Sequence, residues 1–419
     1  MEMIKPKIAR RINEKTLLVS VDIGAYINYG YGRRPDRTEI KPFKFSIDRP
    51  GFVHVWKRIK ESQAQHPLER IVVGFESTSV YGEPLVHFLK DRPVEVVQVN
   101  PMHTKRLKEL EGNSPNKTDR KDPRVIADVI ELGHFLTVVV PEGPAAELRR
   151  LSHSRERAIE RKGRLENQLH GLIFLLFPEF WRIMKGLKSK SARYLLDRHP
   201  RPQDIVSLGV EALTAELKKV SQGKLGRTRA QALLEAAQHS AGLQEGQASI
   251  LFEVQRLLRE WETNEESIKQ AEQKMSHYLK QVPYSPSLLS IKGIGEVTAA
   301  GLIGEVGDFR KFRTIAEVLK LAGLDLYEIS SGQHQGQRHI SKRGRAFLRK
   351  LLYFAAIGTV RKGGIFRVSY QQHVAAGMAK PKVLIAMARK LLGIIVALVR
   401  DHSQYQTDYV KEAALPLAA

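Results

Sequence analysis

The fold is set by an apolar stretch near the N-terminus that reads Leu17-Leu18-Val19-Ser20-Val21-Asp22-Ile23. Its alternating β-branched residues predict a strand from Thr16 to Ile23, with Asp22 close to the carboxyl end. Gly24 follows, and the chain is able to turn there. A second apolar stretch, Ile71-Val72-Val73-Gly74-Phe75-Glu76, also predicts a strand that ends in a carboxylate.

The residues around these two strands alternate between strand-like and helical patterns. We predict strands over residues 27–31, 40–46 and 94–99, and helices over residues 49–63 and 80–90. Strands that alternate with helices indicate an α/β domain whose sheet is covered on both faces. Three strands, a helix and a strand ending in glutamate is the element order of an RNase H-like fold. This is an analogy of fold, which does not by itself give a function.

A later stretch adds two more carboxylates, Asp119 and Asp122, three residues apart among basic residues. The stretch reads Asn116-Lys117-Thr118-Asp119-Arg120-Lys121-Asp122-Pro123-Arg124-Val125-Ile126-Ala127. Alone, such a pair is typical of a solvated helix start. Together with Asp22 and Glu76 it supplies the oxygen ligands that Mg²⁺ prefers. A pair of such ions about 4 Å apart holds the attacking and leaving oxygens of a phosphodiester.

The position of the helix start decides how the acidic pair is presented. With Asp122 as the N-cap, Pro123 takes the first helical position, where its missing N–H costs nothing. Asp119 then lies one turn outside the helix. With Asp119 as the N-cap, Asp122 lies in the first turn instead. We prefer Asp122 as the cap, and both carboxylates are able to face one site in either case.

The composition restricts the classes of partner and compartment. A chain of 419 residues with formal charge +23 and a pI near 10 predicts two or three domains and a polyanionic partner, above all nucleic acid. The absence of cysteine excludes disulfides and thiolate zinc sites and fits a reducing cytoplasm. The basic N-terminus lacks the apolar segment of a signal peptide. The apolar run 383–399 is too short and too charged to span a bilayer, so we expect no membrane association.

Two long helical stretches occupy the middle of the chain, over residues 147–176 and 248–282. Apolar residues recur every seven positions in each. These residues are Leu151, Ala158, Leu165 and Leu172 in the first and Val254, Trp261, Ile268 and Met275 in the second. The repeats predict an antiparallel coiled-coil arm around a smaller helical insert at 190–245, although two ordinary bundle helices fit as well. The charged faces suit subunit contacts or nucleic acid, and the sequence leaves both open.

The C-terminal third contains a glycine turn between two predicted helices, Ile291-Lys292-Gly293-Ile294-Gly295. Gly293 and Gly295 in such a turn resemble a helix-hairpin-helix, whose exposed N–H groups suit a DNA phosphate. A glycine turn that merely packs two helices together is an equal alternative.

A polar loop farther on carries the dipeptide Ser330-Ser331 before Gly332. Basic residues follow it, namely Arg338, Lys342, Arg343, Arg345 and Arg349. A serine hydroxyl is a weak nucleophile until a base or metal activates it, and cations around it stabilise a phosphodiester and its developing charge. His334 and His339 are candidate acids or bases, although isolated histidines are more often structural.

The ordered set of short motifs resembles that of the DEDD transposases of bacterial insertion sequences, the family that includes the Piv-type DNA invertases. In the N-terminal half the motifs are Val-Asp-Ile (21–23), Phe-Glu-Ser-Thr-Ser-Val-Tyr (75–81), Val-Asn-Pro (99–101) and Lys-Thr-Asp-Arg-Lys-Asp (117–122). In the C-terminal half they are Ile-Lys-Gly-Ile-Gly (291–295), Ala-Gly-Leu (322–324), Ser-Gly (331–332), Ile-Ser-Lys-Arg-Gly (340–344) and Leu-Arg (348–349).

The resemblance implies a domain order and a chemistry. It implies a RuvC-like catalytic domain over residues 1–146, a coiled-coil and helical middle over 147–284, a transposase domain over 285–400 and a tail over 401–419. In that family four acids bind Mg²⁺ (Mn²⁺ is an alternative), and here they are Asp22, Glu76, Asp119 and Asp122. The family serine matches Ser331, which attacks a DNA phosphate to give a covalent phosphoserine.

The resemblance also implies partners. Members of the family are guided by a structured non-coding RNA that pairs with donor and target DNA, and their dimers pair into a tetramer. Three departures from the family pattern stand at Gly24-Ala25, Pro123 and Arg345, and none removes a catalytic group. Two alternatives remain: a RuvC-like metal-dependent junction nuclease without a serine adduct, and a basic nucleic-acid-binding protein without catalysis. Ser330 remains an alternative nucleophile.

Overall fold

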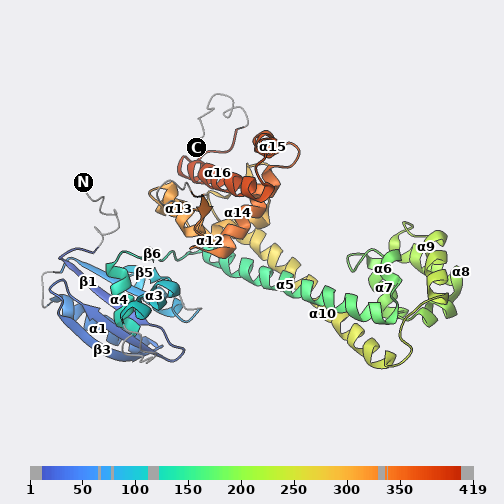
Figure 1. Cartoon of the computed structure of the whole chain (residues 1–419), viewed down its shortest axis with the longest axis horizontal. Coiled ribbons are helices and arrows are strands. Elements are labelled where there is room, and N and C mark those ends of the chain that lie inside the picture. Colours follow the sequence, from blue (N-terminus) through green and yellow to red (C-terminus); the bar gives the residue numbers. More distant parts are fainter. Residues whose placement is uncertain are drawn as a thin grey trace. The chain divides into compact units, whose positions relative to one another are not determined.

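The computed structural model describes residues 12–64, 68–76, 80–111, 122–328, 336 and 338–406. The contacts divide the chain into two compact units, Met1–Val140 and Pro141–Ala419. The N-terminal unit is a sheet covered by helices, and the C-terminal unit is mostly helical (Figure 1).

The described strands of the N-terminal unit form a six-stranded mixed sheet in the order β3-β2-β1-β4-β5-β6. The strands are β1 (Thr16–Asp22), β2 (Ile27–Arg33), β3 (Glu39–Ser46), β4 (Arg70–Glu76), β5 (Glu95–Val99) and β6 (Phe135–Thr137). Strand β4 runs parallel to both β1 and β5, and the other neighbours are antiparallel. The predicted strands are confirmed. The sequence prediction missed β6, because three residues are too few for a periodic pattern.

Helices cover the two faces of this sheet, each over its own apolar cluster. They are α1 (Arg49–Ala64), α2 (Glu83–Leu89), α3 (Pro101–Glu111) and α4 (Asp122–Glu131). Leu17, Val19 and Val21 pack with residues of α1 and α2, whereas Leu18 packs with residues of α4. This alternation follows from the two-residue period of a strand. A Cβ atom at Gly74 of β4 would lie 2.2 Å from Cδ1 of Ile130, so glycine lets α4 approach the sheet closely.

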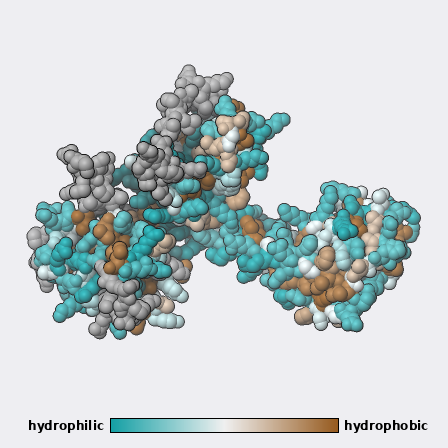
Figure 2. All heavy atoms as spheres, viewed as in Figure 1, coloured by the Kyte–Doolittle hydropathy of each residue, from teal (hydrophilic) through white to brown (hydrophobic). Residues whose placement is uncertain are grey.

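Two antiparallel helices of the C-terminal unit form the arm, α5 (Pro144–Leu176) and α10 (Gln247–Leu279). The Asn264 amide donates to the Ala158 carbonyl at 2.6 Å, and the Trp261 indole donates to Glu166 at 3.1 Å. Increasing numbers on one helix meet decreasing numbers on the other, so the predicted antiparallel pairing is confirmed. Hydrophilic residues cover most of the visible surface of the arm (Figure 2).

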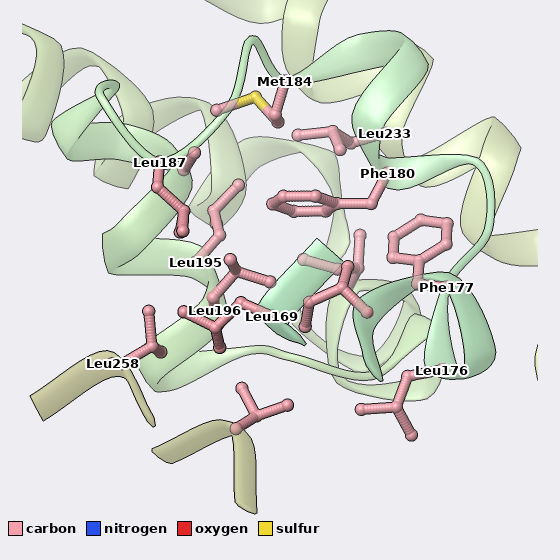
Figure 3. Packing of buried hydrophobic residues seen from close by; sticks show 14 of the residues in the cluster. Leu169, Leu176, Phe177, Phe180, Met184, Leu187, Leu195, Leu196, Leu233 and Leu258 are labelled. Atoms are coloured by element: carbon pink, nitrogen blue, oxygen red, sulfur yellow. The ribbon is translucent and has the colours of Figure 1, made fainter. Parts of the chain in front are cut away.

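The segment between the two arm helices folds into four further helices, which we call the tip. They are α6 (Phe180–Ile183), α7 (Lys190–Arg198), α8 (Pro202–Ser221) and α9 (Arg227–Gln238). Their apolar side chains pack with the ends of α5 and α10 in one cluster that includes Phe177, Phe180 and Leu258 (Figure 3). This cluster stabilises the distal end of the arm.

The C-terminal helical domain follows α10 and packs around α16. Its elements are α11 (Ser285–Leu289), α12 (Glu296–Val306), η2 (Phe309–Lys311), α13 (Ile315–Ala322), β7 (Leu326–Tyr327), β8 (His339–Ile340), α14 (Ala346–Thr359), α15 (Arg367–Ala375) and α16 (Lys380–Arg400). Helix α16 contacts α11, α13, α14, α15 and η2, and α12 packs on both arm helices. No helix in the part of the chain that the structure describes is long and apolar enough to cross a membrane.

Candidate active site

Two predicted acids end neighbouring parallel strands of the N-terminal sheet. Val21 of β1 is paired with Phe75 of β4, so the next residues, Asp22 and Glu76, lie at the same level of the sheet. The Ser20 hydroxyl donates to the Pro123 carbonyl of α4 at 2.5 Å. Side chains two residues apart in a strand share a face, and Asp22 therefore lies on the face that α4 covers.

The carboxylate of Glu76 is held on this same face by a buried threonine. The Thr104 hydroxyl of α3 donates to Oε1 of Glu76 at 2.8 Å, and Thr104 is only 2% exposed. Helices α3 and α4 contact one another. The hydrogen bond fixes the orientation of the Glu76 carboxylate through Oε1.

A third predicted acid, Asp122, begins helix α4 beside the same strand end. The prediction placed Asp122 as the cap and Pro123 as the first helical residue, and the observed helix begins one residue earlier. Asp122 accepts from the Lys108 ammonium at 2.7 Å, and its side chain is 14% exposed. The contact of Ser20 with Pro123 brings the start of α4 to the carboxyl end of β1.

The remaining predicted catalytic residues, Asp119 and Ser331, lie outside the described residues, as do Ser330 and His334. Over the described ranges, no three Asp, Glu, His or Cys side chains gather into a group able to hold a metal ion. The donor chemistry at the strand ends does fit a hard divalent cation, because Asp22 and Glu76 supply carboxylate oxygens from adjacent parallel strands.

The glycine turn of the C-terminal domain joins α11 to α12, as predicted. Gly293 has φ +110°, and a Cβ atom there would lie 2.6 Å from the carbonyl carbon of Gly358 in α14. Gly293 is thus required for close packing of two backbones. Gly295 precedes α12, and a Cβ atom there would meet nothing within 4 Å. Its role as a phosphate contact stays a prediction.

The five predicted phosphate-binding cations fall into two groups. Lys342 and Arg343 are exposed, and neither side chain has a hydrogen bond or ion pair to any described residue. Arg338 pairs with Glu328 at 3.1 Å, and Nη1 of Arg349 donates to the Ala322 carbonyl at 3.0 Å. Burial lowers the pKa of Arg349. Lys342 and Arg343 are therefore the better placed to contact a polyanion.

Arg345 belongs to a buried charge cluster around Glu305, which is 1% exposed. Nε2 of His153 lies 2.7 Å from Oε1 of Glu305, and the guanidinium groups of Arg149 and Arg345 lie 3.7 and 3.9 Å from its carboxylate. Burial raises the pKa of Glu305, but the His153 hydrogen bond and the two arginines outweigh it and lower the pKa. The cluster joins α5, α12 and the start of α14.

The sequence analysis missed Thr104, Lys108 and Glu305. The signal for Thr104 was its place in the first turn of the helix after β5, close to the carboxyl ends of the parallel strands. The signal for Glu305 was a lone carboxylate in the otherwise apolar run of α12. Nothing in the sequence around Lys108 indicates its ion pair with Asp122, beyond its position on a helix.

Comparison with known families matches both halves of the chain. Residues 19–178 match a DEDD transposase domain of the IS110 type, described as a transposase. Residues 285–371 match a domain described as a transposase of the IS116/IS110/IS902 family. The first match contains Asp22, Glu76, Asp119 and Asp122, and the second contains Ser331.

Whole proteins of insertion elements are also similar to this chain. A 43.6 kDa protein of insertion element IS110 from Streptomyces coelicolor is 23% identical, over 93% of this chain and 96% of that protein. A 44.8 kDa protein of IS116 from Streptomyces clavuligerus is 26% identical over 68% and 71%. The transposase of IS1111A from Coxiella burnetii is 22% identical over 86% and 87%. With both transposase domains in one chain, this protein is an insertion-sequence transposase of the IS110 family, an enzyme of DNA transposition.

Proposed function

We propose that this transposase cleaves and rejoins DNA through a covalent phosphoserine at Ser331, assisted by Mg²⁺ (or Mn²⁺) at Asp22, Glu76, Asp119 and Asp122. The observation that carries the proposal is the placement of Asp22 and Glu76 at one level of two parallel strands, on the face where α4 begins. The strand order β3-β2-β1-β4-β5 supports a RuvC-like reading of this unit.

The residues of the site divide into carboxylates that would hold the metal ion and side chains that orient those carboxylates. Asp22 and Glu76 would hold a divalent cation through carboxylate oxygens, and Thr104 keeps Glu76 in one orientation. When bound, the ion supplies Lewis acidity and a template for the reacting oxygens. Asp122 is restrained by Lys108 and would join the site by exchanging that ion pair.

The serine step exchanges one phosphate ester for another. Oγ of Ser331 attacks phosphorus, its O–P bond forms, and the bond to the leaving deoxyribose oxygen breaks. The serine proton passes to a base, and the leaving oxygen takes a proton. Rejoining reverses these steps with a hydroxyl of the partner strand. Lys342 and Arg343, both exposed and unpaired among the described residues, would hold phosphate oxygens near the cleavage site.

Specificity and assembly extend the same proposal. A structured guide RNA would pair with donor and target DNA, and dimers would pair into a tetramer in which the acids and Ser331 act together. The family resemblance carries this part, and the formal charge of +23 supports binding of both DNA and RNA.

The test is to purify the protein with its copurifying nucleic acid and add the element's end DNA with Mg²⁺. The proposal expects an SDS-resistant protein–DNA band that disappears in Ser331→Ala and persists in the neighbouring control Ser330→Ala. A band that survives Ser331→Ala would remove that serine from the mechanism. Cut DNA with free ends and no band would favour the junction-nuclease alternative. Sequencing of the copurified RNA then tests for a guide.

A further inference from the structure

The two arm helices enclose a shallow cavity of about 310 Å³ close to the tip. Leu165 of α5 and Leu257 of α10 form its buried floor, at 3% and 1% exposure. The other lining residues are Arg161, Arg164, Gln168, Arg256 and Glu260. We call this cavity the arm groove.

The arm groove concentrates positive charge that the protein leaves partly uncompensated. Arg256 of α10 is paired with Glu260 at 3.3 Å and with Glu253, outside the lining, at 4.0 Å. Arg161 and Arg164, which lie one turn apart on α5, have no hydrogen bond or ion pair to any residue in the ranges that the structure describes. The lining therefore contains three guanidinium groups and one carboxylate, and the two arginines of α5 are the ones left without a counter-charge among the described residues.

Neighbouring cations on the same helix behave differently. Arg155 and Lys162 of α5 both form ion pairs across the arm, with Glu272 and Glu265 of α10. Helix α10 thus supplies a carboxylate to Arg155 and to Lys162 of α5, whereas Glu253 and Glu260 pair with Arg256 of their own helix. Like charges held together are unfavourable, and an anion from outside relieves the repulsion.

The chemistry of the lining residues selects the anion. Guanidinium groups match the oxygens of a phosphate in pairs of parallel hydrogen bonds, and the Gln168 amide adds a neutral donor. A cationic cavity in a transposase of formal charge +23 fits the phosphate backbone of a nucleic acid better than an acidic protein segment.

We infer that the arm groove binds the phosphodiester backbone of DNA or RNA, with Arg161, Arg164 and Arg256 as its cations. The arm is then a nucleic-acid-binding element, one of the two uses that its sequence left open. This inference does not depend on the serine or on the acids, because binding at the groove involves no bond breakage.

The test is the salt dependence of binding to the full-length protein, measured by fluorescence anisotropy. The variant Arg161→Gln/Arg164→Gln is compared with the natural sequence on a short duplex DNA and on a structured RNA hairpin. Loss of two phosphate contacts is expected to reduce the slope of log K against log salt by about 1.8 on duplex DNA, since each contact contributes about 0.9. The probe that responds identifies DNA, RNA or both as the ligand.

The matched control is Arg198→Gln/Arg227→Gln, which removes the same charge from the tip. Both control arginines are exposed and already paired, with Asp197 and Glu211. A second groove variant, Gln168→Glu, keeps every arginine, adds a carboxylate to the lining and is expected to weaken binding. An unchanged slope on both probes, or an equal loss in the tip control, would overturn the inference. Thermal melting of each variant confirms that it is folded.

Discussion

Asp22 and Glu76 end two adjacent parallel strands one residue beyond the paired Val21 and Phe75. Glu76 is held by the hydroxyl of Thr104, and the residue two before Asp22 is bonded to the start of α4. The backbone hydrogen bonds of the sheet therefore hold the Cα atoms of both acids at one level, and Thr104 orients the carboxylate of Glu76. Two acids placed at strand ends of a hydrogen-bonded sheet suit phosphoryl chemistry, which needs its catalytic groups held on a firm scaffold.

Removing either carboxylate charge is expected to abolish strand cleavage and leave DNA binding intact. Asp22→Asn and Glu76→Gln keep the side-chain shape but weaken an oxygen ligand, and we expect activity to fall by roughly 100-fold or more. The exposed Glu61→Gln is the control on α1. Cleavage is followed on labelled end DNA with Mg²⁺. Full activity in Asp22→Asn would contradict its proposed role.

Thr104→Val tests whether the hydroxyl orients Glu76. The substitution keeps the volume and removes the hydrogen bond, so we expect a loss of about 10- to 100-fold in Mg²⁺ affinity, read from the metal concentration that half-saturates cleavage. Thr104→Ser should restore most of that affinity. If Val and Ser behave alike at saturating and limiting Mg²⁺, Thr104 only fills space.

Two glycines of one turn are expected to respond in opposite ways. Gly293→Ala strains a backbone with φ +110° and pushes a methyl group into Gly358, so it should lower stability by about 2 kcal/mol or more. Gly295→Ala has free space and should change stability by less than about 0.5 kcal/mol. Thermal unfolding of both variants measures this difference. Equal effects would show that contact with α14 is unimportant.

Glu305→Gln is expected to destabilise the C-terminal unit by about 3 kcal/mol, because Arg149 and Arg345 lose a buried counter-charge. Glu296→Gln, exposed on the same helix, is the control. The folded pKa of Glu305 is lowered from 4.5, so its contribution is fully present above pH 4.5 and is lost as the pH falls through the lowered value. The free energy of unfolding should therefore fall less steeply with decreasing pH in Glu305→Gln than in the natural sequence. Parallel curves for the two proteins would contradict the assigned role of Glu305.

The basic residues after the serine motif are expected to separate into binding and structural groups. Lys342→Gln/Arg343→Gln should weaken DNA binding and reduce its salt slope while leaving the melting temperature unchanged, since both side chains are exposed. Arg345→Gln and Arg349→Gln should lower the melting temperature, because these side chains bond inside the fold. Fluorescence anisotropy measures DNA binding, and calorimetry on the same samples measures the melting temperature. A stable Arg345→Gln with weak DNA binding would reverse the assignment.

The periodic parts of the fold were predictable from the sequence. Strand β1 and strand β4 each bury an apolar run, and the arm helices repeat their apolar residues every seven positions. These patterns are local consequences of backbone geometry, so they need no knowledge of distant residues. Strand β6 was not predictable, because it exists only through its pairing with β5.

The sequence predicted which residue types form the candidate site, but only some of the side chains that contact those residues. Asp22 and Glu76 were recognisable because a carboxylate at the end of an apolar strand is unusual. The roles of Arg345 and Thr104 were not, because each depends on a residue far away in the chain, Glu305 for the first and Glu76 for the second. Side-chain pairing of this kind has no sequence period.

The sequence by itself provided the transposase motifs, five of the six described strands of the sheet, the two long helices of the arm and the expectation of a polyanionic partner. These follow from local periodicity, residue chemistry and summed charge. Only the tertiary structure decided that Asp22 and Glu76 share one face, that Gly293 serves close packing against α14, and that Arg256 of α10 meets Arg161 and Arg164 of α5 in the arm groove. Those properties arise from contacts between segments far apart in the chain, which folding brings together.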